Sequence, residues 1–357
     1  MSSADITCNL LHLSQTFNYS IKLFCKRSIE SSFNYHWDIS NMFFRLAIAV
    51  LTAILIIATS IMSPGITSEK TVKPKVPGVY QFELGDFRIT ALSDGTVPLD
   101  LHSVLTNTNP VEIDSLLDRS FLTNPVETSI NVFLIDTGDK QVLVDTGSGE
   151  LFGDRGGKLP MSLQAAGYRA DDIDIVLLTH IHPDHSGGLV VGGQLMFPAA
   201  TVYVGKPDID FWLNPANAKR SPNYQRYINE AVKTVKPYID VDKLKPFSGE
   251  TVILPGITAR PTPGHTPGHS FYQVESKGES IEFWGDILHV ASVQFPKPKI
   301  TIEFDVDSNA AAAQRAKQFA EAETSRRLVA PAHVSFPGVG HIRAENQGYA
   351  WVPVDYR

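Results

Sequence analysis

Four side chains that can bind metal ions lie within six consecutive residues, directly after an apolar segment. They are His180, His182, Asp184 and His185. Pro183 disfavours a helical conformation at His182, and in a continued strand His185 would point away from the other three. We therefore expect a loop at the end of a strand, from which the four side chains diverge into two adjacent metal sites.

Three further candidate ligands have the same placement, because each follows a predicted strand. They are His265 after residues 257–261, Asp286 after residues 281–285, and His333 after residues 328–332. Asp145 also ends an apolar segment, and we expect it to orient a ligating histidine through a hydrogen bond. A lone histidine such as His269 is more often a hydrogen-bonded structural residue than a ligand, so we place His269 behind the ligands.

The cluster predicts a dinuclear hydrolytic centre. Carboxylates beside several histidines in a semi-buried turn would be costly without a cation to compensate them. Two neighbouring divalent cations lower the pKa of a shared water, polarise the substrate and stabilise the leaving oxygen. The nitrogen and oxygen donors suit zinc first and also accept manganese, cobalt or iron. Asp184 can relay the proton of the bridging hydroxide.

The elements around these residues alternate between strands and helices. Hairpins are expected at residues 79–92 and 130–144, and helices at residues 158–166, 225–235 and 309–323. Further strands are expected at residues 173–178, 201–204, 257–261, 271–275, 281–284 and 328–330. Because each sheet must bury its apolar face, the layer rule predicts two sheets packed face to face with helices outside.

The ordered motifs resemble the metallo-β-lactamase superfamily, and the similarity spans residues 79–357. That resemblance implies an α/β fold, an αββα sandwich with its site between the edges of the sheets. It also implies a ligand set in two groups bridged by Asp286. The first metal would be held by His180, His182 and His265, and the second by Asp184, His185 and His333.

Within this superfamily the chain is most similar to the methyl parathion hydrolase and lactonase-like group, in residues 84–95, 285–290 and 331–343. This resemblance implies hydrolysis of an uncharged aryl phosphotriester, lactone or ester, and a homodimer. It also implies an aromatic substrate pocket, for which Phe152, Trp212 and Tyr227 are the candidates. Acyl-homoserine lactonases carry a tyrosine where this chain has His289, and we assign His289 to catalysis together with Asp184 and Asp286.

Three alternative functions remain at this point. One is a persulfide dioxygenase with a single iron, and another is a thioesterase similar to glyoxalase II on the same fold. A noncatalytic metal-binding protein is the third. The net charge of -7 argues against nucleic acid as a partner, which would require clustered basic residues. A small-molecule substrate is expected instead.

The N-terminal part differs in composition from the rest. Residues 46–62 form an apolar run after one cationic residue, which indicates a secretory signal or membrane anchor over residues 42–65; a buried core helix is the alternative. Residues 1–41 form an extension of uncertain origin, residues 66–77 a linker, and residues 78–357 the hydrolase domain. Both cysteines, Cys8 and Cys25, precede the apolar run, so thiolate ligands are excluded from the domain. We expect an exported protein, periplasmic or secreted, or one anchored to the membrane only by this segment.

Overall fold

The computed structural model describes residues 77–356. The predicted signal or anchor at residues 42–65 therefore lies outside the described residues. Within the part that is described, none of the helices combines the length and the apolar character needed to cross a membrane.

The first sheet has seven strands in the order β1-β2-β4-β5-β6-β9-β10. Its strands are β1 (Val79–Leu84), β2 (Phe87–Leu99), β4 (Val126–Asp136), β5 (Gln141–Val144), β6 (Ile175–Leu177), β9 (Thr201–Gly205) and β10 (Leu244–Phe247). Both predicted hairpins are confirmed, since β1 pairs antiparallel with β2 and β4 with β5. From β5 onward the pairing is parallel. Both faces of β6 are covered, with Val176 in one apolar cluster and Leu177 in another, so its residues are apolar without alternation.

The second sheet also has seven strands, in the order β11-β12-β13-β14-β16-β17-β18. Its strands are β11 (Thr251–Leu254), β12 (Ile257–Pro261), β13 (Ser270–Ser276), β14 (Glu279–Gly285), β16 (Leu328–Pro331), β17 (Gly340–Glu345) and β18 (Gly348–Pro353). The β17–β18 hairpin was not predicted. Most of its residues are partly or fully exposed, so its sequence lacks the apolar alternation by which strands are recognised.

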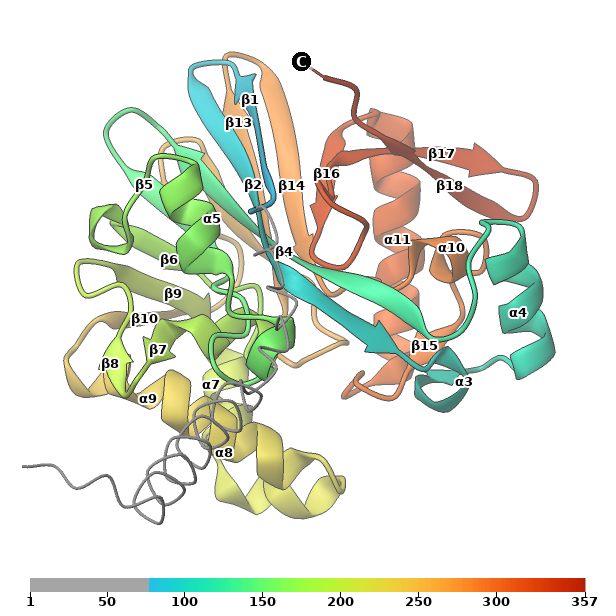
Figure 1. Ribbon diagram of the computed structural model, residues 1–357, viewed down its shortest axis with the longest axis horizontal. Helices are drawn as coiled ribbons and strands as arrows, with labels where there is room; N and C mark the ends of the chain where they lie inside the picture. Colours follow the sequence, from blue (N-terminus) through green and yellow to red (C-terminus); the bar gives the residue numbers. More distant parts are fainter. Residues whose placement is uncertain (1–76, 357) are drawn as a thin grey trace, which may run out of the picture. The chain divides into compact units, whose positions relative to one another are not determined.

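Apolar residues divide the domain into four layers (Figure 1). One cluster, including Phe133 and Phe283, fills the space between the two sheets. A second covers the outer face of the first sheet with helices α5 (Leu159–Ala165), α7 (Lys206–Trp212), α8 (Tyr224–Thr234) and α9 (Lys236–Asp240). A third lies between the second sheet and helices α10 (Ala291–Gln294) and α11 (Ser308–Ser325). The predicted arrangement of two sheets with helices outside is thus present.

The three predicted helices correspond to α5, α8 and α11. Helix α11 begins where the Asp307 carboxylate accepts a hydrogen bond from the Ala310 backbone N–H, and it ends at Arg326 in a left-handed conformation. Its buried residues include Phe319 and Ala322, which pack on the second sheet. Helix position is therefore set by capping residues at the ends and by one apolar face.

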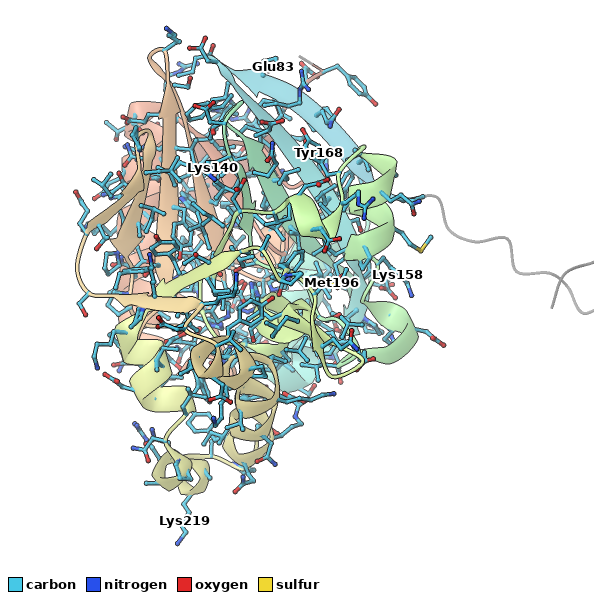
Figure 2. All side chains as sticks on the ribbon, turned by 90° about the vertical axis from the view of Figure 1, so that its left-hand side faces the viewer. Glu83, Lys140, Lys158, Tyr168, Met196 and Lys219 are labelled. Atoms are coloured by element: carbon cyan, nitrogen blue, oxygen red, sulfur yellow. The ribbon has the colours of Figure 1, made fainter. Side chains whose placement is uncertain are left out.

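Short elements surround the layers. An additional apolar cluster joins α3 (Leu101–Val104), α4 (Pro110–Asp118) and α10 with a two-stranded sheet of β3 (Leu105–Thr106) and β15 (Thr301–Ile302). The remaining pieces are β7 (Val190–Val191), β8 (Gln194–Leu195), η1 (Gly153–Arg155), η2 (Ala170–Asp172), η3 (Gly187–Leu189) and η4 (Pro215–Arg220). Figure 2 shows Glu83, at the tip of the β1–β2 hairpin, and Lys219, in η4, at opposite ends of the domain.

Candidate metal centre

The motif of four close ligands begins at the end of β6, as predicted, but it is not entirely a loop. Residues Pro183–Ser186 form a single helical turn, α6, and His182 precedes it in an extended conformation. The expectation of a loop was wrong for this part, because Pro183 restricts the residue before it and fits well as the first residue of a helix. Successive helical residues are rotated by about 100°, so Asp184 and His185 point in different directions.

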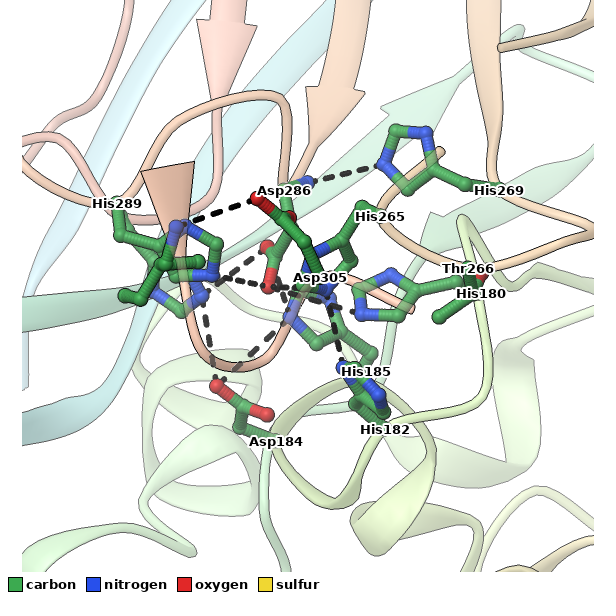
Figure 3. Close-up of polar contacts among 12 residues, drawn as sticks. His180, His182, Asp184, His185, His265, Thr266, His269, Asp286, His289 and Asp305 are labelled. Atoms are coloured by element: carbon green, nitrogen blue, oxygen red, sulfur yellow. Dashed lines mark hydrogen bonds and ion pairs between the residues drawn. The ribbon is translucent and has the colours of Figure 1, made fainter. Parts of the chain in front are cut away.

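The other three candidates reach the same place from the second half of the chain. His265 follows β12, Asp286 follows β14, and His333 follows β16, and Figure 3 shows the first two beside the histidines of the motif. Gly285 makes the approach of Asp286 feasible. Its φ is +51°, and a Cβ there would lie 2.7 Å from the Thr179 hydroxyl oxygen, so only glycine fits.

The structure brings the candidate ligands together in two groups. Within each group, one ligand atom from every residue lies within 4.8 Å of the others. The first group is His180, His182, His265 and Asp286, and the second is Asp184, His185 and His333. These are the two sets that the resemblance implied.

Asp286 lies between the two groups. Its Oδ2 atom is 3.6 Å from His180 Nε2 and 3.3 Å from His265 Nε2, while its Oδ1 atom is 3.0 Å from both His185 Nε2 and His333 Nε2. Each carboxylate oxygen therefore faces a different group. This is the arrangement of a bridging ligand.

Metal ions would satisfy the donor atoms of the candidate ligands better than contacts among these atoms do. His180 Nε2, His185 Nε2 and Asp286 Oδ1 are buried and, despite these short distances, take part in no hydrogen bond of suitable geometry. Three such atoms in one place would cost free energy, because each has lost water without a replacement. Cations at the two groups would satisfy them all.

The pKa values of His180 and Asp286 agree with this interpretation, whereas burial lowers but neighbouring carboxylates raise, on balance, the pKa values of His185, His265 and His333. Burial, followed by the charge of His185, holds the pKa of His180 well below its usual value, so its imidazole is neutral, as a ligand must be. Burial alone would raise the pKa of Asp286, but the imidazoles of His185 and His333 hold it well below the usual range. Asp286 is thus a carboxylate.

Several of the ligand rings are held by the protein through the ring nitrogen that faces away from the centre. His185 Nδ1 is 2.8 Å from Asp145 Oδ2, and Asp145 also accepts a hydrogen bond from the Thr179 backbone N–H. His333 Nδ1 is 2.7 Å from the Ser129 carbonyl oxygen. Such contacts fix the tautomer and the orientation of each ring, and Asp145 lies where the sequence placed it.

Three supporting residues were missed by the sequence analysis. Asp305 Oδ1 lies 2.9 Å from His265 Nδ1. The buried Asp208 accepts hydrogen bonds from the Ile181 and Gly268 backbone N–H groups. It thereby connects the segment that carries His180 and His182 to the segment that follows His265. Arg315, fully buried, donates to the Ile287 carbonyl oxygen directly after the bridging aspartate. No local pattern marks these residues, because the contacts that link them to the site span 27 or more residues of the chain.

Two further histidines contact Asp286. The Asp286 backbone N–H donates a hydrogen bond to His269 Nε2, and burial lowers the pKa of His269 to about 3, which keeps this ring neutral and able to accept. His269 therefore holds the backbone behind the ligand. His289 Nε2 lies 3.1 Å from Asp286 Oδ2, and His289, Asp286 and His333 form a third close group.

A pocket of about 320 Å³ opens above the two groups. Phe152 and Tyr227 line it, as does Phe304, which the sequence did not indicate. Trp212 does not line this pocket. It is fully buried and packs behind His182 and Tyr227, with ring centroids 5.2 and 5.8 Å away, because its side chain points from α7 into the core. This corrects the expectation that Trp212 borders the substrate.

The comparisons with known proteins agree on the family. Residues 125–345 match the family model of the metallo-beta-lactamase superfamily. The solved structure of hydrolase AbOPH, in the beta lactamase superfamily, is 35% identical with a TM-score of 0.76, and the match covers 80% of this chain and 100% of that one. The resemblance inferred from the motifs is confirmed.

Two lactonases are also similar. AidC, a dizinc quorum-quenching lactonase solved in complex with the product N-hexanoyl-L-homoserine, is 28% identical with a TM-score of 0.71, again over 80% of this chain and 100% of that chain. An N-acyl homoserine lactonase of a Bacillus species is 25% identical over 115 residues, which make up 32% of this chain and 38% of that protein. The match therefore spans less than half the length of this curated relative.

Proposed function

The chain belongs to the metallo-β-lactamase superfamily, and from this premise we propose that it is a dinuclear metal-dependent hydrolase. The bond it cleaves is an uncharged ester-type bond in a lactone, an aryl ester or a phosphotriester. The observation that carries this proposal is the position of Asp286, with one carboxylate oxygen toward each of two histidine groups.

The ligands are assigned from these groups. One ion is held by His180, His182 and His265, the other by Asp184, His185 and His333, and Asp286 belongs to both. Zinc suits these nitrogen and oxygen donors, and AidC is a dizinc protein by its description. When bound, two divalent cations supply a water of lowered pKa as nucleophile and polarise the substrate oxygen.

Asp184 is the proton-transfer group in this proposal. It lines the pocket, and its side chain is 16% exposed, against 3% for Asp286. A carboxylate with access to the pocket can take a proton from the attacking water and return it to the leaving oxygen. His289, which lines the same pocket and lies against Asp286 Oδ2, keeps that carboxylate in its bridging orientation.

The walls of the pocket define the substrate class. Val97, Leu99, Phe152, Phe304 and Tyr227 provide an apolar and aromatic lining, which favours a substrate with apolar groups around the scissile bond. AbOPH is described as a hydrolase and AidC as a lactonase. The first description supports hydrolysis, and the second supports a lactone as the bond that is cleaved.

A substrate panel and elemental analysis test the proposal. The full chain is purified, its metal content is measured, and hydrolysis is compared for a phosphotriester, dihydrocoumarin, an acyl-homoserine lactone, a thioester and a chromogenic β-lactam. We expect about two metal ions per chain and turnover of one of the first three. Turnover of the thioester alone would favour the alternative similar to glyoxalase II.

A single iron per chain, with oxygen consumption and no hydrolysis, would instead identify a persulfide dioxygenase. The second group of Asp184, His185 and His333 speaks against that alternative, because a mononuclear enzyme has no use for it. A protein that binds two metals and turns over nothing in the panel would be a noncatalytic metal-binding protein.

We further propose that the protein is exported and forms a homodimer. Export rests on the apolar run at residues 46–62, and the dimer rests on the resemblance to the methyl parathion hydrolase group. Cell fractionation with an antibody to the domain tests the first proposal. Light scattering of the purified chain tests the second, and a monomer at micromolar concentration would refute it.

A further inference from the structure

The rim of the pocket carries two arginines that the proposed chemistry does not use. Arg155, in η1, and Arg226, in α8, both line the pocket above the metal ligands. They come from elements far apart in the sequence, so their convergence on one opening is a property of the fold. The remaining lining is apolar apart from Thr128 and the metal-ligand candidates with His289.

The backbone at Arg155 is firmly held. A Cβ on Gly95 would lie 2.0 Å from the Arg155 carbonyl oxygen, so the first sheet touches the loop at this residue. The buried Asp94 carboxylate accepts hydrogen bonds from the Ser148 and Gly157 backbone N–H groups, one on each side of Arg155. The loop that carries Arg155 is thus held on both sides of this residue, so the backbone position of Arg155 is fixed.

Within residues 77–356, the Arg155 side chain nevertheless has no partner. Among the described residues it makes no ion pair and no hydrogen bond through its guanidinium group, and its residue is exposed. A guanidinium group carries five N–H donors in a planar fork. All of them are available to a ligand in the pocket.

Arg226 is oriented by an aromatic ring. Its guanidinium carbon lies 4.8 Å from the centre of the Tyr227 ring, and Tyr227 forms part of the pocket wall. Among the described residues its ion-pair partner is Glu230, 3.8 Å away on the next helical turn, which is beyond hydrogen-bond distance. Stacking on the ring leaves the edges of the guanidinium group free to donate.

The pocket offers these arginines no negative charge. Its acidic lining residues are Asp184 and Asp286, and two divalent cations more than offset the charge of two carboxylates. Glu303, next to the lining residue Phe304, forms no ion pair with either arginine within the described part of the chain. A cleft with low-dielectric walls concentrates anions when cationic groups lie at its rim, here Arg155 and Arg226, the second with a 3.8 Å contact to Glu230.

We propose that Arg155 and Arg226 form a subsite for an anionic group, a carboxylate or a phosphate or sulfate ester, at the end of the substrate remote from the scissile bond. The inference rests on the proposed function and narrows its substrate class. The bond that is cleaved is uncharged, whereas the far end of the molecule is an acid. A planar guanidinium group binds such oxyanions through paired hydrogen bonds.

Two esters of equal acyl length test this subsite. The mono-para-nitrophenyl ester of glutaric acid carries a terminal carboxylate, and para-nitrophenyl valerate carries a methyl group in its place. With the zinc-loaded full chain, we expect kcat/KM for the glutarate ester to exceed that for the valerate by about tenfold at low salt, mostly through KM. Raising the ionic strength should remove most of this preference, because exposed charges are screened.

The variants are Arg155→Gln and Arg226→Gln. Each should lose about three- to fivefold on the glutarate ester, the size expected of an exposed charge interaction, and change the valerate by less than about twofold. Arg226→Lys should recover part of the loss. Arg220→Gln is the matched control, since Arg220 also stacks on an aromatic ring, that of Phe211 at 5.0 Å, but does not line the pocket.

A binding measurement separates this inference from the proposed function. Calorimetry with the para-nitroanilide of glutaric acid, which resists hydrolysis, should show binding that both glutamine variants weaken and the Arg220 variant does not. If neither of these esters nor any of the first three panel substrates is hydrolysed, the proposed function fails, while the calorimetry still decides the subsite. Equal kcat/KM values for the two esters, or equal losses on both esters in the variants, would overturn the subsite.

Discussion

The floor and the rim of one pocket are built in opposite ways. On the floor, the candidate ligands His180, His182 and Asp286 are buried, and the ligand rings are held from behind by groups such as Asp145 and the Ser129 carbonyl. On the rim, Arg155 and Arg226 are exposed and have few contacts.

This difference indicates that the floor of the pocket carries out the reaction, whereas the rim selects the substrate. A metal centre requires ligands fixed within a fraction of an ångström, which only a packed and hydrogen-bonded surrounding provides. Substrate selection by exposed charge requires no such rigidity, and its contribution is smaller and depends on salt. Changes on the floor should therefore affect every substrate, whereas changes on the rim should affect only some.

The largest effect is expected from Asp286→Ala. Loss of the carboxylate that faces both groups should reduce kcat/KM at least about a thousandfold for every substrate and lower the metal content from about two ions per chain. Steady-state kinetics with elemental analysis of the same preparation measures both. Near-normal turnover in this variant would show that the floor is not the catalytic centre.

Removing the metal tests, without any substitution, whether the ligands on the floor hold ions that hydrolysis requires. Dialysis against a chelator should abolish hydrolysis and lower the free energy of unfolding by about 4 kcal/mol, the stabilisation given by a ligand at a thousand times its dissociation constant. Zinc should restore both. Calorimetric melting of the metal-free and reloaded chain provides the measurement, and identical melting temperatures would mean that these residues hold no metal.

Asp305→Asn should have an intermediate effect. The carboxylate lies 2.9 Å from His265 Nδ1, and loss of such an orienting contact costs about ten- to a hundredfold in metal affinity or activity. Zinc titration against a competing chelator measures the affinity. Asp307→Asn is the control, because Asp307 caps α11 and asparagine caps equally well; similar losses in both variants would mean that the effect is not transmitted through His265.

The smallest effect concerns the rim. Arg226→Gln should leave the metal content and the melting temperature unchanged, since its side chain is about half exposed and contacts no candidate ligand. Its effect on an anionic substrate should decrease as salt is added. Elemental analysis, thermal melting and kinetics at two ionic strengths check this. A loss of metal in this variant would remove the distinction between floor and rim.

The sequence reveals what is encoded locally. His180 to His185 can be recognised as a metal motif because its four ligands are close together in the chain, and hairpins such as β1–β2 are marked by the turn at Gly85. Asp145 could be recognised because it follows an apolar strand, as the candidate ligands do, and His269 lies four residues after the ligand candidate His265.

Long-range packing was beyond the sequence. Asp305 contacts a histidine that lies 40 residues before it, and nothing in its immediate neighbours indicates this. Trp212 was expected at the substrate because it is aromatic, but an aromatic side chain fills a core as readily as a pocket wall. The arginines of the rim converge from η1 and α8 only when α8 is folded against the first sheet.

The central claim is that two metal ions share Asp286, and anomalous diffraction from crystals of the zinc-loaded full chain tests it most directly. The account predicts two anomalous peaks about 3.5 to 4 Å apart, with the Asp286 carboxylate between them. A single peak among His180, His182 and His265, with Asp184 and His333 free of metal, would contradict it.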